Sequence, residues 1–424
     1  MRIGFVIGRI GGIDGVALET EKWIEVLTRL GHEVFVLTGA LEGEVEDISL
    51  LPELAFDHPN TVEEQEVAFL GRAGDGVMLE ALIETGAELI AHGITEWVED
   101  WGIDCLVPEN ACALPCHLQM GLGIARAVER TGVIAVTHDH DFWWEREGRY
   151  DAAFPFVEQM VAEHFPLVRP GIRHAVINTA ARTTLAERYG VDATVVPNVM
   201  DFEAPFAVCD DYNVSLREDL GLTADDRLLF QITRIVRRKG IETAIELVER
   251  LADPRVKLVI TGTATDDSDH YLADLLAMVA RLDLGDRIRF AGDRFDNQRR
   301  RDATDRKVYS LADAYAHADA CTYFSTYEGF GNAFVEAVLA RVPVFVNDYE
   351  PVYTPDIGSK GFRTVQIRGG ELTDAAVGQI RTLLDDPAER AAIADHNFAL
   401  GREHFSYEAL AAILGPLFDD VMAR

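Results

Sequence analysis

Two carboxylates, Glu328 and Glu336, lie eight residues apart on either side of a glycine-bounded turn, 329–331. The turn follows an apolar run typical of a strand, and a helical pattern begins near Asn332. Such a turn places backbone N–H groups at a helix N-terminus, which suits a phosphate. Because carboxylates accept hydrogen bonds from hydroxyls, the pattern indicates one acid for a ribose and one for a hexose, with a diphosphate between them.

Basic side chains gather in TRIVRRKG, positions 233–240, directly after the first strand that we expect in the second half of the chain. This stretch sets Arg234 and Lys239 five residues apart at the carboxyl end of that strand. Charge-assisted hydrogen bonds act at about 2.8 Å, well inside a Debye length of about 8 Å, so local cations can outweigh a distant acidic surface. The stretch predicts a diphosphate site, and its alternative is a solvated basic loop.

A glycine loop, RIGGIDG at 9–15, follows the first expected strand. Glycines at such a turn let the backbone approach a phosphate or a sugar at a helix N-terminus. The order is not G-x-G-x-x-G, and the second strand ends in LTG, 37–39, with no acid to hold a ribose. The loop therefore argues against a nicotinamide cofactor, and a tight strand-to-helix turn is its structural alternative.

Apolar runs and helical patterns alternate along the chain, which predicts an α/β fold with open parallel sheets covered on both faces. Ligands of such sheets bind beyond the carboxyl ends of the strands. Residues 41–75 are acidic and poorly periodic, so we expect a solvated excursion there. The strands expected are 2–8, 32–39, 103–109, 133–139, 173–178 and 194–198, then 227–233, 257–262, 287–292, 320–325 and 342–347.

A chain of 424 residues exceeds the size of a single hydrophobic core, which favours two domains. The alternation loosens after 203 and restarts at 227, so we place the boundary at 205. The two domains expected are 1–205 and 206–405. The remaining segment, about 406–424, has an amphipathic helical pattern.

The formal net charge of −33 argues against nucleic acid or an anionic membrane surface as partner. Residues 1–205 carry 13 Lys and Arg against 35 Asp and Glu, a net −22, which leaves −11 for the rest. An anionic ligand is therefore expected in the second half.

No apolar run approaches the roughly 18 residues that a membrane span needs, and the first one is too short for a signal peptide. The five scattered cysteines form no zinc pattern and indicate reduced thiols. We expect a cytoplasmic protein without membrane insertion, and the sequence permits an oligomer.

Four features occur together: E-x7-E from Glu328 to Glu336, the Arg234/Lys239 pair, VVPNVMDFE at 195–203 and the loop 9–15. Together they resemble the GT4 family of retaining glycosyltransferases, and the resemblance covers essentially the whole chain. It implies the GT-B fold, with two facing Rossmann-like domains and a cleft between them. It also implies an N-terminal acceptor-binding domain, a C-terminal nucleotide-sugar-binding domain and a C-terminal helix that packs back on the first domain.

The resemblance implies roles for single residues in the second half. Arg234 and Lys239 would bind the nucleotide diphosphate, and Glu336 the ribose. Glu328 would act as a catalytic residue at the transferred sugar. The further positions expected to bind the donor are Gly12, Gly329, Phe330, Gly331 and Asn332.

The first half contributes VTHDHDFWWEREGR, 136–149, at a strand end. In the family a histidine after this strand lies by the donor sugar, and His138 matches it as a catalytic residue. The alternative is a histidine satisfied inside a loop. Paired tryptophans can stack on a sugar or pack as buried aromatics, and two arginines of this stretch, at 146 and 149, suit an acceptor carboxylate or phosphate. The residues expected to bind the acceptor are Asp14, Gly15, His140, Trp143, Trp144 and Arg146.

Asp139-His140-Asp141 also spells D-x-D, which other glycosyltransferases use to hold a metal. In a GT-B protein Arg234, Lys239 and a helix end can neutralise the diphosphate instead. We therefore expect no required cofactor or metal, and Mg²⁺ not to be essential.

GGIDGVALETEKW and HDHDFWWER resemble a GT4 subgroup associated with compatible solutes such as mannosylglucosylglycerate. The function implied is retaining transfer of a hexose from a nucleotide sugar, of the GDP-mannose or UDP-glucose type, to a small polar acceptor such as a glycerate glycoside. The alternatives are a sugar-nucleotide 2-epimerase of the same fold and a non-catalytic sugar-nucleotide-binding protein. None of the five lysines has a convincing pocket for the Schiff base of a phosphorylase.

Overall fold

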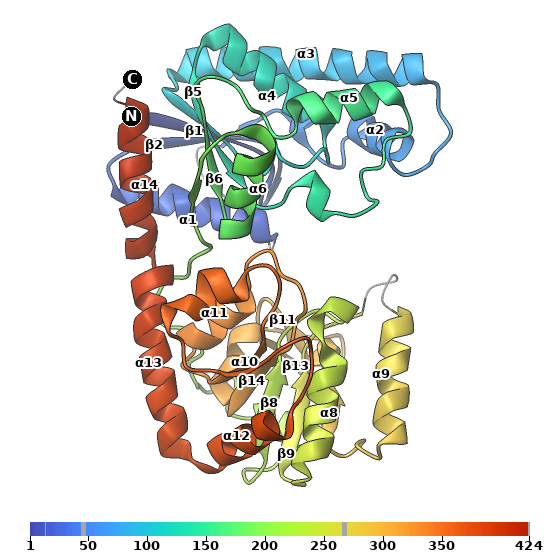
Figure 1. Ribbon diagram of the computed structural model, residues 1–424, viewed down its shortest axis with the longest axis vertical. Coiled ribbons are helices and arrows are strands. Elements are labelled where there is room, and N and C mark those ends of the chain that lie inside the picture. Colours follow the sequence, from blue (N-terminus) through green and yellow to red (C-terminus); the bar gives the residue numbers. More distant parts are fainter. Residues whose placement is uncertain (13, 44–47, 265–268, 423–424) are drawn as a thin grey trace. The chain divides into compact units, whose positions relative to one another are not determined.

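A computed structural model describes residues 1–12, 14–43, 48–264 and 269–422 of the chain. The chain divides into two compact units, Met1–Val199 with Leu410–Arg424 and Met200–Ala409 (Figure 1). The first unit thus ends at 199, where the sequence pattern had suggested 205. Each unit is built on an open parallel sheet, as the alternation of strands and helices predicts.

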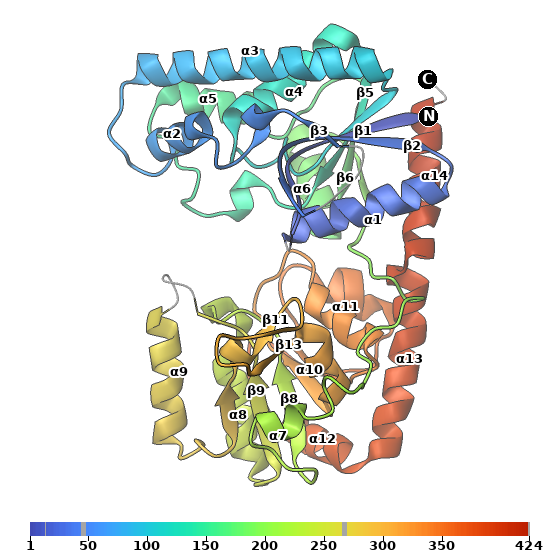
Figure 2. The ribbon, with the colours of Figure 1, turned by 180° about the vertical axis from the view of Figure 1, so that it is seen from behind.

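The first unit has a seven-stranded sheet of order β3-β2-β1-β4-β5-β6-β7 in which every pair is parallel. In Figures 1 and 2 helices α3, α4 and α5 lie on one side of this sheet and α1 and α6 on the other. Its elements are β1 (Arg2–Gly11), α1 (Gly15–Arg29), β2 (Glu33–Glu42), β3 (Ile48–Leu50), α2 (Pro59–Ala68), α3 (Gly76–Trp101), β4 (Cys105–Pro108), α4 (Leu118–Thr131), β5 (Ile134–Asp139), α5 (Pro155–His164), β6 (Ile172–Val176), α6 (Thr179–Tyr189) and β7 (Ala193–Val195).

Covering both faces of the sheet explains why its strands are apolar throughout instead of alternating. All four residues of β4 are buried, as are five of the six in β5. The helices that follow the strands begin at polar caps: Asp14 caps α1 and Asn178 caps α6. Caps of this kind satisfy the first backbone N–H groups of a helix. The helix starts therefore lie at the carboxyl edge of the sheet, where polar side chains also gather.

Three local expectations for the first unit are wrong. Strand β1 runs on to Gly11 and pairs with β2 as far as Glu42, so the first three of the seven residues expected to form a turn at 9–15 belong to the strand. The segment 41–75 is not simply solvated, because it contains β3 and α2, and Glu64 on α2 is fully buried. Helix α3, the longest of the unit's described helices, lies in a region to which the sequence pattern had assigned no element.

The second unit has a six-stranded parallel sheet of order β10-β9-β8-β14-β15-β16 and a small sheet of order β11-β13-β12. Its elements are α7 (Leu216–Asp219), β8 (Arg227–Gln231), α8 (Ile241–Leu251), β9 (Val256–Ile260), α9 (Asp269–Arg281), β10 (Ile288–Phe290), β11 (Phe295–Asp296), β12 (Arg300–Arg301), β13 (Lys307–Ser310), α10 (Leu311–His317), β14 (Ala320–Tyr323), α11 (Asn332–Leu339), β15 (Val344–Asn347), β16 (Val365–Ile367), α12 (Asp374–Asp385) and α13 (Pro387–Phe405), and the last helix of the chain is α14 (Tyr407–Met422).

One apolar cluster forms the main core of this unit. Helices α8, α9 and α12 contribute buried Ile, Leu, Val and Tyr side chains that pack against the strands of the six-stranded sheet. Helix α8 carries its apolar residues at helical spacing, which gives it one buried face. Most of α14 belongs with the first unit, where Asp420 pairs with Arg173 at 3.2 Å.

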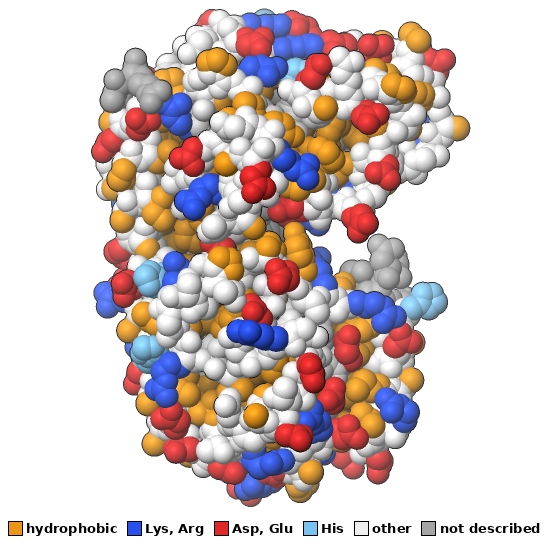
Figure 3. Space-filling model, in the orientation of Figure 1, with side chains coloured by type: hydrophobic (Ala, Val, Ile, Leu, Met, Phe, Trp, Pro, Cys, Tyr) orange, Lys and Arg blue, Asp and Glu red, His pale blue; other side chains and the backbone are white. Residues whose placement is uncertain are grey.

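The surface agrees with the acidic composition. On the face drawn in Figure 3, Asp and Glu side chains are interleaved with Lys and Arg over both units. Among the helices of the described residues, none combines the length and the low polarity needed to cross a membrane.

Candidate active site

A buried ion pair joins two loops of the second unit. Lys239 donates from Nζ to Oε1 of Glu328, and Arg238 donates from one guanidinium nitrogen to Oε2 of the same carboxylate at 2.8 Å. Both Lys239 and Glu328 are largely buried, with 9% and 6% exposed. One carboxylate therefore receives two cations on its two oxygens.

The sheet topology brings these residues together. Lys239 follows β8 and Glu328 follows β14, and these strands are neighbours in the parallel sheet, so both residues lie at its carboxyl edge. The two loops are tied by a backbone hydrogen bond of 2.8 Å from Thr326 N–H to the Arg238 carbonyl. The geometry is thus held by the backbone as well as by the charges.

Electrostatics at this pair favour the charged carboxylate. Burial by itself raises the pKa of Glu328, but the charges of Lys239 and Arg238 outweigh it and leave this pKa below its ordinary value. Burial also lowers the pKa of Lys239, and the Glu328 carboxylate only partly offsets that effect. An anionic ligand that reaches Lys239 would further favour its protonated form.

Helix α11 begins shortly after Glu328, and its N-cap is Gly331. This residue has φ of +122°, and a Cβ on it would come within 2.2 Å of the Tyr349 hydroxyl, so only glycine fits. The Phe330 side chain is buried, and its carbonyl accepts a hydrogen bond from Tyr349 at 3.1 Å. The N–H groups of Phe330 and Gly331 donate to no described residue, which leaves them available for a phosphate at the helix N-terminus.

The other predicted donor residues of the second unit lie apart from the ion pair. Glu336 lies on α11 and accepts a hydrogen bond of 2.9 Å from the Tyr315 hydroxyl. The Arg234 side chain is exposed and its guanidinium forms no ion pair or hydrogen bond with the described residues, while its carbonyl accepts a hydrogen bond of 3.1 Å from the Val236 N–H. Their roles toward ribose and diphosphate remain predictions.

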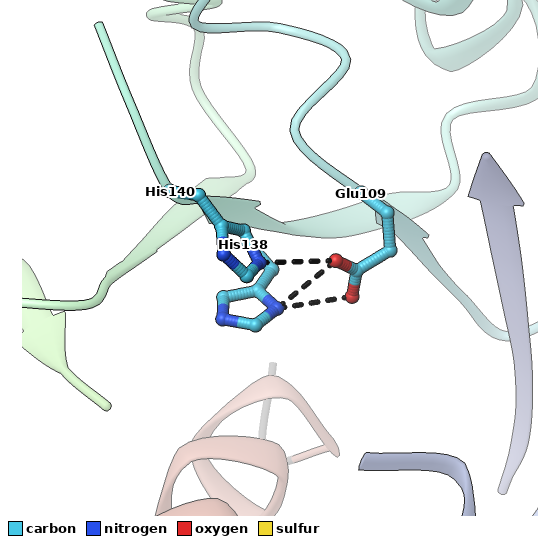
Figure 4. A group of neighbouring side chains, drawn as sticks. All are labelled: Glu109, His138 and His140. Carbon is cyan, nitrogen blue, oxygen red and sulfur yellow. Dashed lines mark hydrogen bonds and ion pairs between the residues drawn. The ribbon is translucent and has the colours of Figure 1, made fainter. Parts of the chain in front are cut away.

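A second buried polar group lies at the carboxyl edge of the first unit's sheet (Figure 4). His138 Nδ1 lies 3.1 and 3.0 Å from the two carboxylate oxygens of Glu109, and His140 Nε2 lies 3.7 Å from one of them. The His138 ring stacks on Trp23 of α1, with centroids 4.1 Å apart. Nε2 of His138 is buried without a partner among the described residues. The ring is therefore held on one nitrogen and one face, and its second nitrogen can act on a ligand.

Burial also governs the charges of this group. It raises the pKa of Glu109 to about 7 and lowers the pKa of His138 to about 4. Glu109, His138 and His140 place ligand atoms within 4.8 Å of one another, the one such group of His, Cys, Asp and Glu within the described ranges. A carboxylate with two imidazoles suits a transition metal, while the present contacts at 3.0 and 3.1 Å are hydrogen-bond distances.

Replacing Glu109 with glutamine should change how stability depends on pH. The raised pKa means that Glu109 contributes stability below its ordinary value of 4.5 and loses it as the pH rises through about 7. Glutamine cannot ionise. The lowered pKa values of His138 and His140 make stability rise with pH, but this contribution is present in both proteins. We expect the Tm of wild type relative to Glu109→Gln to be higher at pH 5 than at pH 8, measured by calorimetry. A difference that does not vary with pH would contradict the burial effect.

The carboxylates of the D-x-D sequence face different partners. Asp139 accepts a hydrogen bond of 2.7 Å from the Thr137 hydroxyl, and Asp141 pairs with Arg146 at 2.7 Å. Asn110, with φ of +47°, accepts a hydrogen bond of 3.1 Å from the His140 N–H and so positions this segment. The D-x-D aspartates are therefore engaged separately.

The predicted residues of the glycine loop have structural partners. Gly12 has φ of +71°, and a Cβ there would approach a carboxylate oxygen of Glu42 to 2.2 Å. Asp14 caps α1 by accepting hydrogen bonds from Val16 and Ala17 at 3.0 and 3.2 Å. Gly15 is exposed, with nothing within 4 Å of a Cβ built on it. Ile13, between these residues, lies outside the described ranges.

The two tryptophans pack mainly within the first unit. Trp143 donates from Nε1 to the Phe165 carbonyl at 2.9 Å. Trp144 stacks on Phe142 with centroids 4.6 Å apart, and the Arg188 guanidinium lies 4.8 Å from its ring centre. A sugar that stacked on Trp144 would compete with these contacts.

Three residues that contact the candidate groups had not been predicted: Trp23, Glu109 and Arg238. Glu109 ends the expected strand 103–109, and His138 is the second-last residue of the next expected strand, 133–139, so their position at the ends of consecutive strands could have indicated that they meet. Arg238 lies inside the basic stretch 233–240. Trp23 gave no signal, because its apolar side chain fits the buried face of any helix.

The sequence pattern of the family Glycosyl transferases group 1 matches residues 215–398. Over its length the chain is 33% identical to the mannosylglucosylglycerate synthase of Thermotoga maritima, in an alignment that covers 98% of this chain and 99% of that protein. The chain belongs to the group 1 glycosyltransferases.

A further relative resembles the chain in sequence, and a solved structure resembles it in fold. The mannosylglucosylglycerate synthase of Petrotoga mobilis is 29% identical, covering 87% of this chain and 86% of that protein. The Anabaena protein Alr3699/HepE, solved with UDP and glucose, superposes with a TM-score of 0.65 at 18% identity and covers 99% of both chains. This glycosyltransferase therefore has the GT-B fold that its sequence resembles, and neither relative supports the epimerase alternative.

Proposed function

We propose that this glycosyltransferase transfers a mannosyl group from a nucleotide sugar to glucosylglycerate, with retention at the anomeric carbon. The observation that carries the proposal is the end-to-end similarity to two proteins named mannosylglucosylglycerate synthase. The base of the donor stays open between guanine and uracil. The domain roles follow the same proposal, with donor groups in the second unit and acceptor groups in the first.

The geometry of the second unit supports the donor half of the proposal. Lys239 and Arg238 supply buried and half-buried cations, and the start of α11 supplies N–H groups, so a diphosphate would meet donors of two kinds. Glu328, held by both cations, presents a charged carboxylate to a sugar hydroxyl. Glu336 on α11 would hold the ribose, and Arg234 is an exposed cation for the outer phosphate oxygens.

Retention requires that the acceptor hydroxyl attacks the anomeric carbon on the same face from which the phosphate leaves. As the bond to the leaving phosphate breaks, negative charge grows on its oxygen, and this oxygen can take the proton of the acceptor hydroxyl. Lys239 and the α11 N–H groups stabilise charge that develops only in the transition state, which raises kcat. His138, fixed by Glu109 and Trp23, would use its free Nε2 to hold a hydroxyl of the reacting sugar.

Incubation of the protein with GDP-mannose, UDP-mannose, GDP-glucose and UDP-glucose, each with glucosylglycerate, tests the function. We expect one donor to yield a mannosylglucosylglycerate, identified by mass, and NMR of the new linkage to show the anomeric configuration of the donor. Inverted configuration would rule out the front-face mechanism. An isomerised sugar nucleotide without acceptor would support the epimerase instead.

We also propose that no metal is required. Lys239, Arg238 and the start of α11 can neutralise the diphosphate, and the D-x-D aspartates already have protein partners. Enzyme dialysed against EDTA should keep at least half of its kcat, and added MgCl₂ should change the rate less than twofold. Complete loss that Mg²⁺ or Zn²⁺ restores would contradict this and would direct attention to Glu109, His138 and His140.

We also propose that the protein is located in the cytoplasm. The five cysteines are free thiols in the structure, and Cys105, Cys112 and Cys321 are buried. Unpaired thiols are usual for proteins of a reducing compartment.

A further inference from the structure

One half-buried arginine of the first unit, Arg149, forms no ion pair with a carboxylate of the described residues. Among the Lys and Arg of the described residues up to 199, all but Arg149, Arg182 and Arg188 form ion pairs. Arg182 and Arg188 are exposed on α6, whereas Arg149 is half-buried. A partly desolvated cation without a counter-charge is costly unless something else pairs with it.

The guanidinium of Arg149 is held in place with one amino group unused. It donates from NH2 to the side-chain oxygen of Gln65 at 3.3 Å, and it lies 4.7 Å from the ring centre of Tyr150. NH1 is buried and has no partner among the described residues. Since the bond to Gln65 is long, the NH1 and NH2 groups of Arg149 can donate hydrogen bonds to a carboxylate at little cost.

Other unpaired groups lie on the same segment of chain. Nε2 of His138, Oδ1 of Asp139 and Nε2 of His140, the last 3.7 Å from the Glu109 carboxylate, are buried without a hydrogen-bond partner in the described part of the chain, nine to eleven residues before Arg149. Buried polar atoms are normally paired, so a run of unpaired ones marks where a ligand supplies the partners. The segment follows β5 at the carboxyl edge of its sheet, where ligands of α/β proteins bind.

We propose that Arg149 binds the carboxylate of the acceptor and thereby selects an acidic acceptor over a neutral one. The inference rests on the proposed function, because it takes the acceptor to be a glycerate glycoside. Arg146, the arginine predicted for this part of the chain, is the weaker candidate because it already pairs with Asp141 at 2.7 Å and is half exposed. Arg149 keeps its fork available for a bidentate contact.

The charge of the first half makes such a cation necessary for an anionic acceptor. Residues 1–205 carry a net charge of −22, so an acidic ligand is repelled until it lies within hydrogen-bond distance of a local cation. A neutral glycoside meets no such repulsion and gains nothing from Arg149. Removal of the arginine should therefore affect the two kinds of acceptor differently.

Steady-state kinetics with glucosylglycerate and with glucosylglycerol, which has CH₂OH in place of the carboxylate, test the proposal. We expect Arg149→Gln to lower kcat/KM for glucosylglycerate about 10- to 100-fold, mainly through KM, and to leave glucosylglycerol and the KM of the donor near wild type. Arg149→Lys should fall between, because it keeps the charge and loses the fork. Arg130→Gln, which removes a surface arginine paired with Glu88, is the matched control. An equal loss for both acceptors, or no loss, would overturn the proposal.

Binding of glycerate and glycerol, followed by calorimetric titration of wild type and Arg149→Gln, separates this inference from the proposed function. If wild type glycosylates neither acceptor, the transfer reaction is wrong. The carboxylate site still stands if wild type binds glycerate more tightly than glycerol and the variant does not. The proposal of a carboxylate site at Arg149 is contradicted if wild type shows no preference for glycerate over glycerol, or if Arg149→Gln keeps that preference.

Discussion

Replacement of Lys239 with alanine should lower kcat/KM by about 10²- to 10³-fold, with most of the loss in kcat. The ammonium group is buried, pairs with Glu328, and would meet the charge that grows on the leaving phosphate. Its removal withdraws stabilisation that is needed mainly in the transition state. Initial rates over a range of donor and acceptor concentrations measure the effect.

The loss should not come from unfolding. In Lys239→Ala the Glu328 carboxylate keeps its 2.8 Å contact with Arg238, so the buried charge is not left alone. Lys257→Ala is the matched control, because this partly buried lysine of the same unit donates to the Asp286 carbonyl at 3.0 Å away from the ion pair. If Lys239→Ala keeps the kcat/KM of wild type, this lysine does not bind the donor diphosphate.

Replacement of Glu328 with glutamine should act in two opposite directions. Lys239 and Arg238 lose their anionic partner, so both become available to a diphosphate, and we expect GDP or UDP to bind more tightly. The carboxylate that holds the transferred sugar is lost, so kcat should fall about 10²-fold. Calorimetric titration of the nucleotides together with initial rates separates the two effects.

The same variant should show its stability cost at neutral pH. Because the pKa of Glu328 lies below its ordinary value of 4.5, its contribution to stability is present above that value and is lost as the pH falls through the lowered pKa. The Tm of wild type should therefore exceed that of Glu328→Gln more at pH 7 than at pH 4. Glu371→Gln, at an exposed position of the same unit, controls for loss of one negative charge. Weaker nucleotide binding with unchanged kcat would contradict this role of Glu328.

The strand pattern was readable because a sheet covered on both faces needs apolar strands, and every strand expected from the sequence is present within a few residues. Two expectations for the first unit, the turn at 9–15 and the solvated segment 41–75, were wrong. The turn at 9–15 was expected to begin too early, because β1 continues to Gly11 by pairing with β2 and the positive φ angles typical of a turn begin only at Gly11 and Gly12. Residues 41–75 looked solvated because Glu64, which is fully buried, reads as a surface acid. Its carboxylate accepts hydrogen bonds from the Leu118 and Gln119 N–H groups, at 2.6 and 3.1 Å.

By itself the sequence determined the α/β class, the two-part organisation and the chemical types of the candidate residues, because these depend on composition and short-range spacing. The tertiary structure alone decided which of those residues meet. Lys239 and Glu328 are 89 residues apart and pair because β8 and β14 are neighbours in the sheet. Glu109 reaches His138 because β4 lies beside β5. Strand order is a property of the whole sheet, so no local pattern could show that Arg238 shares a carboxylate or that Arg149 lacks one.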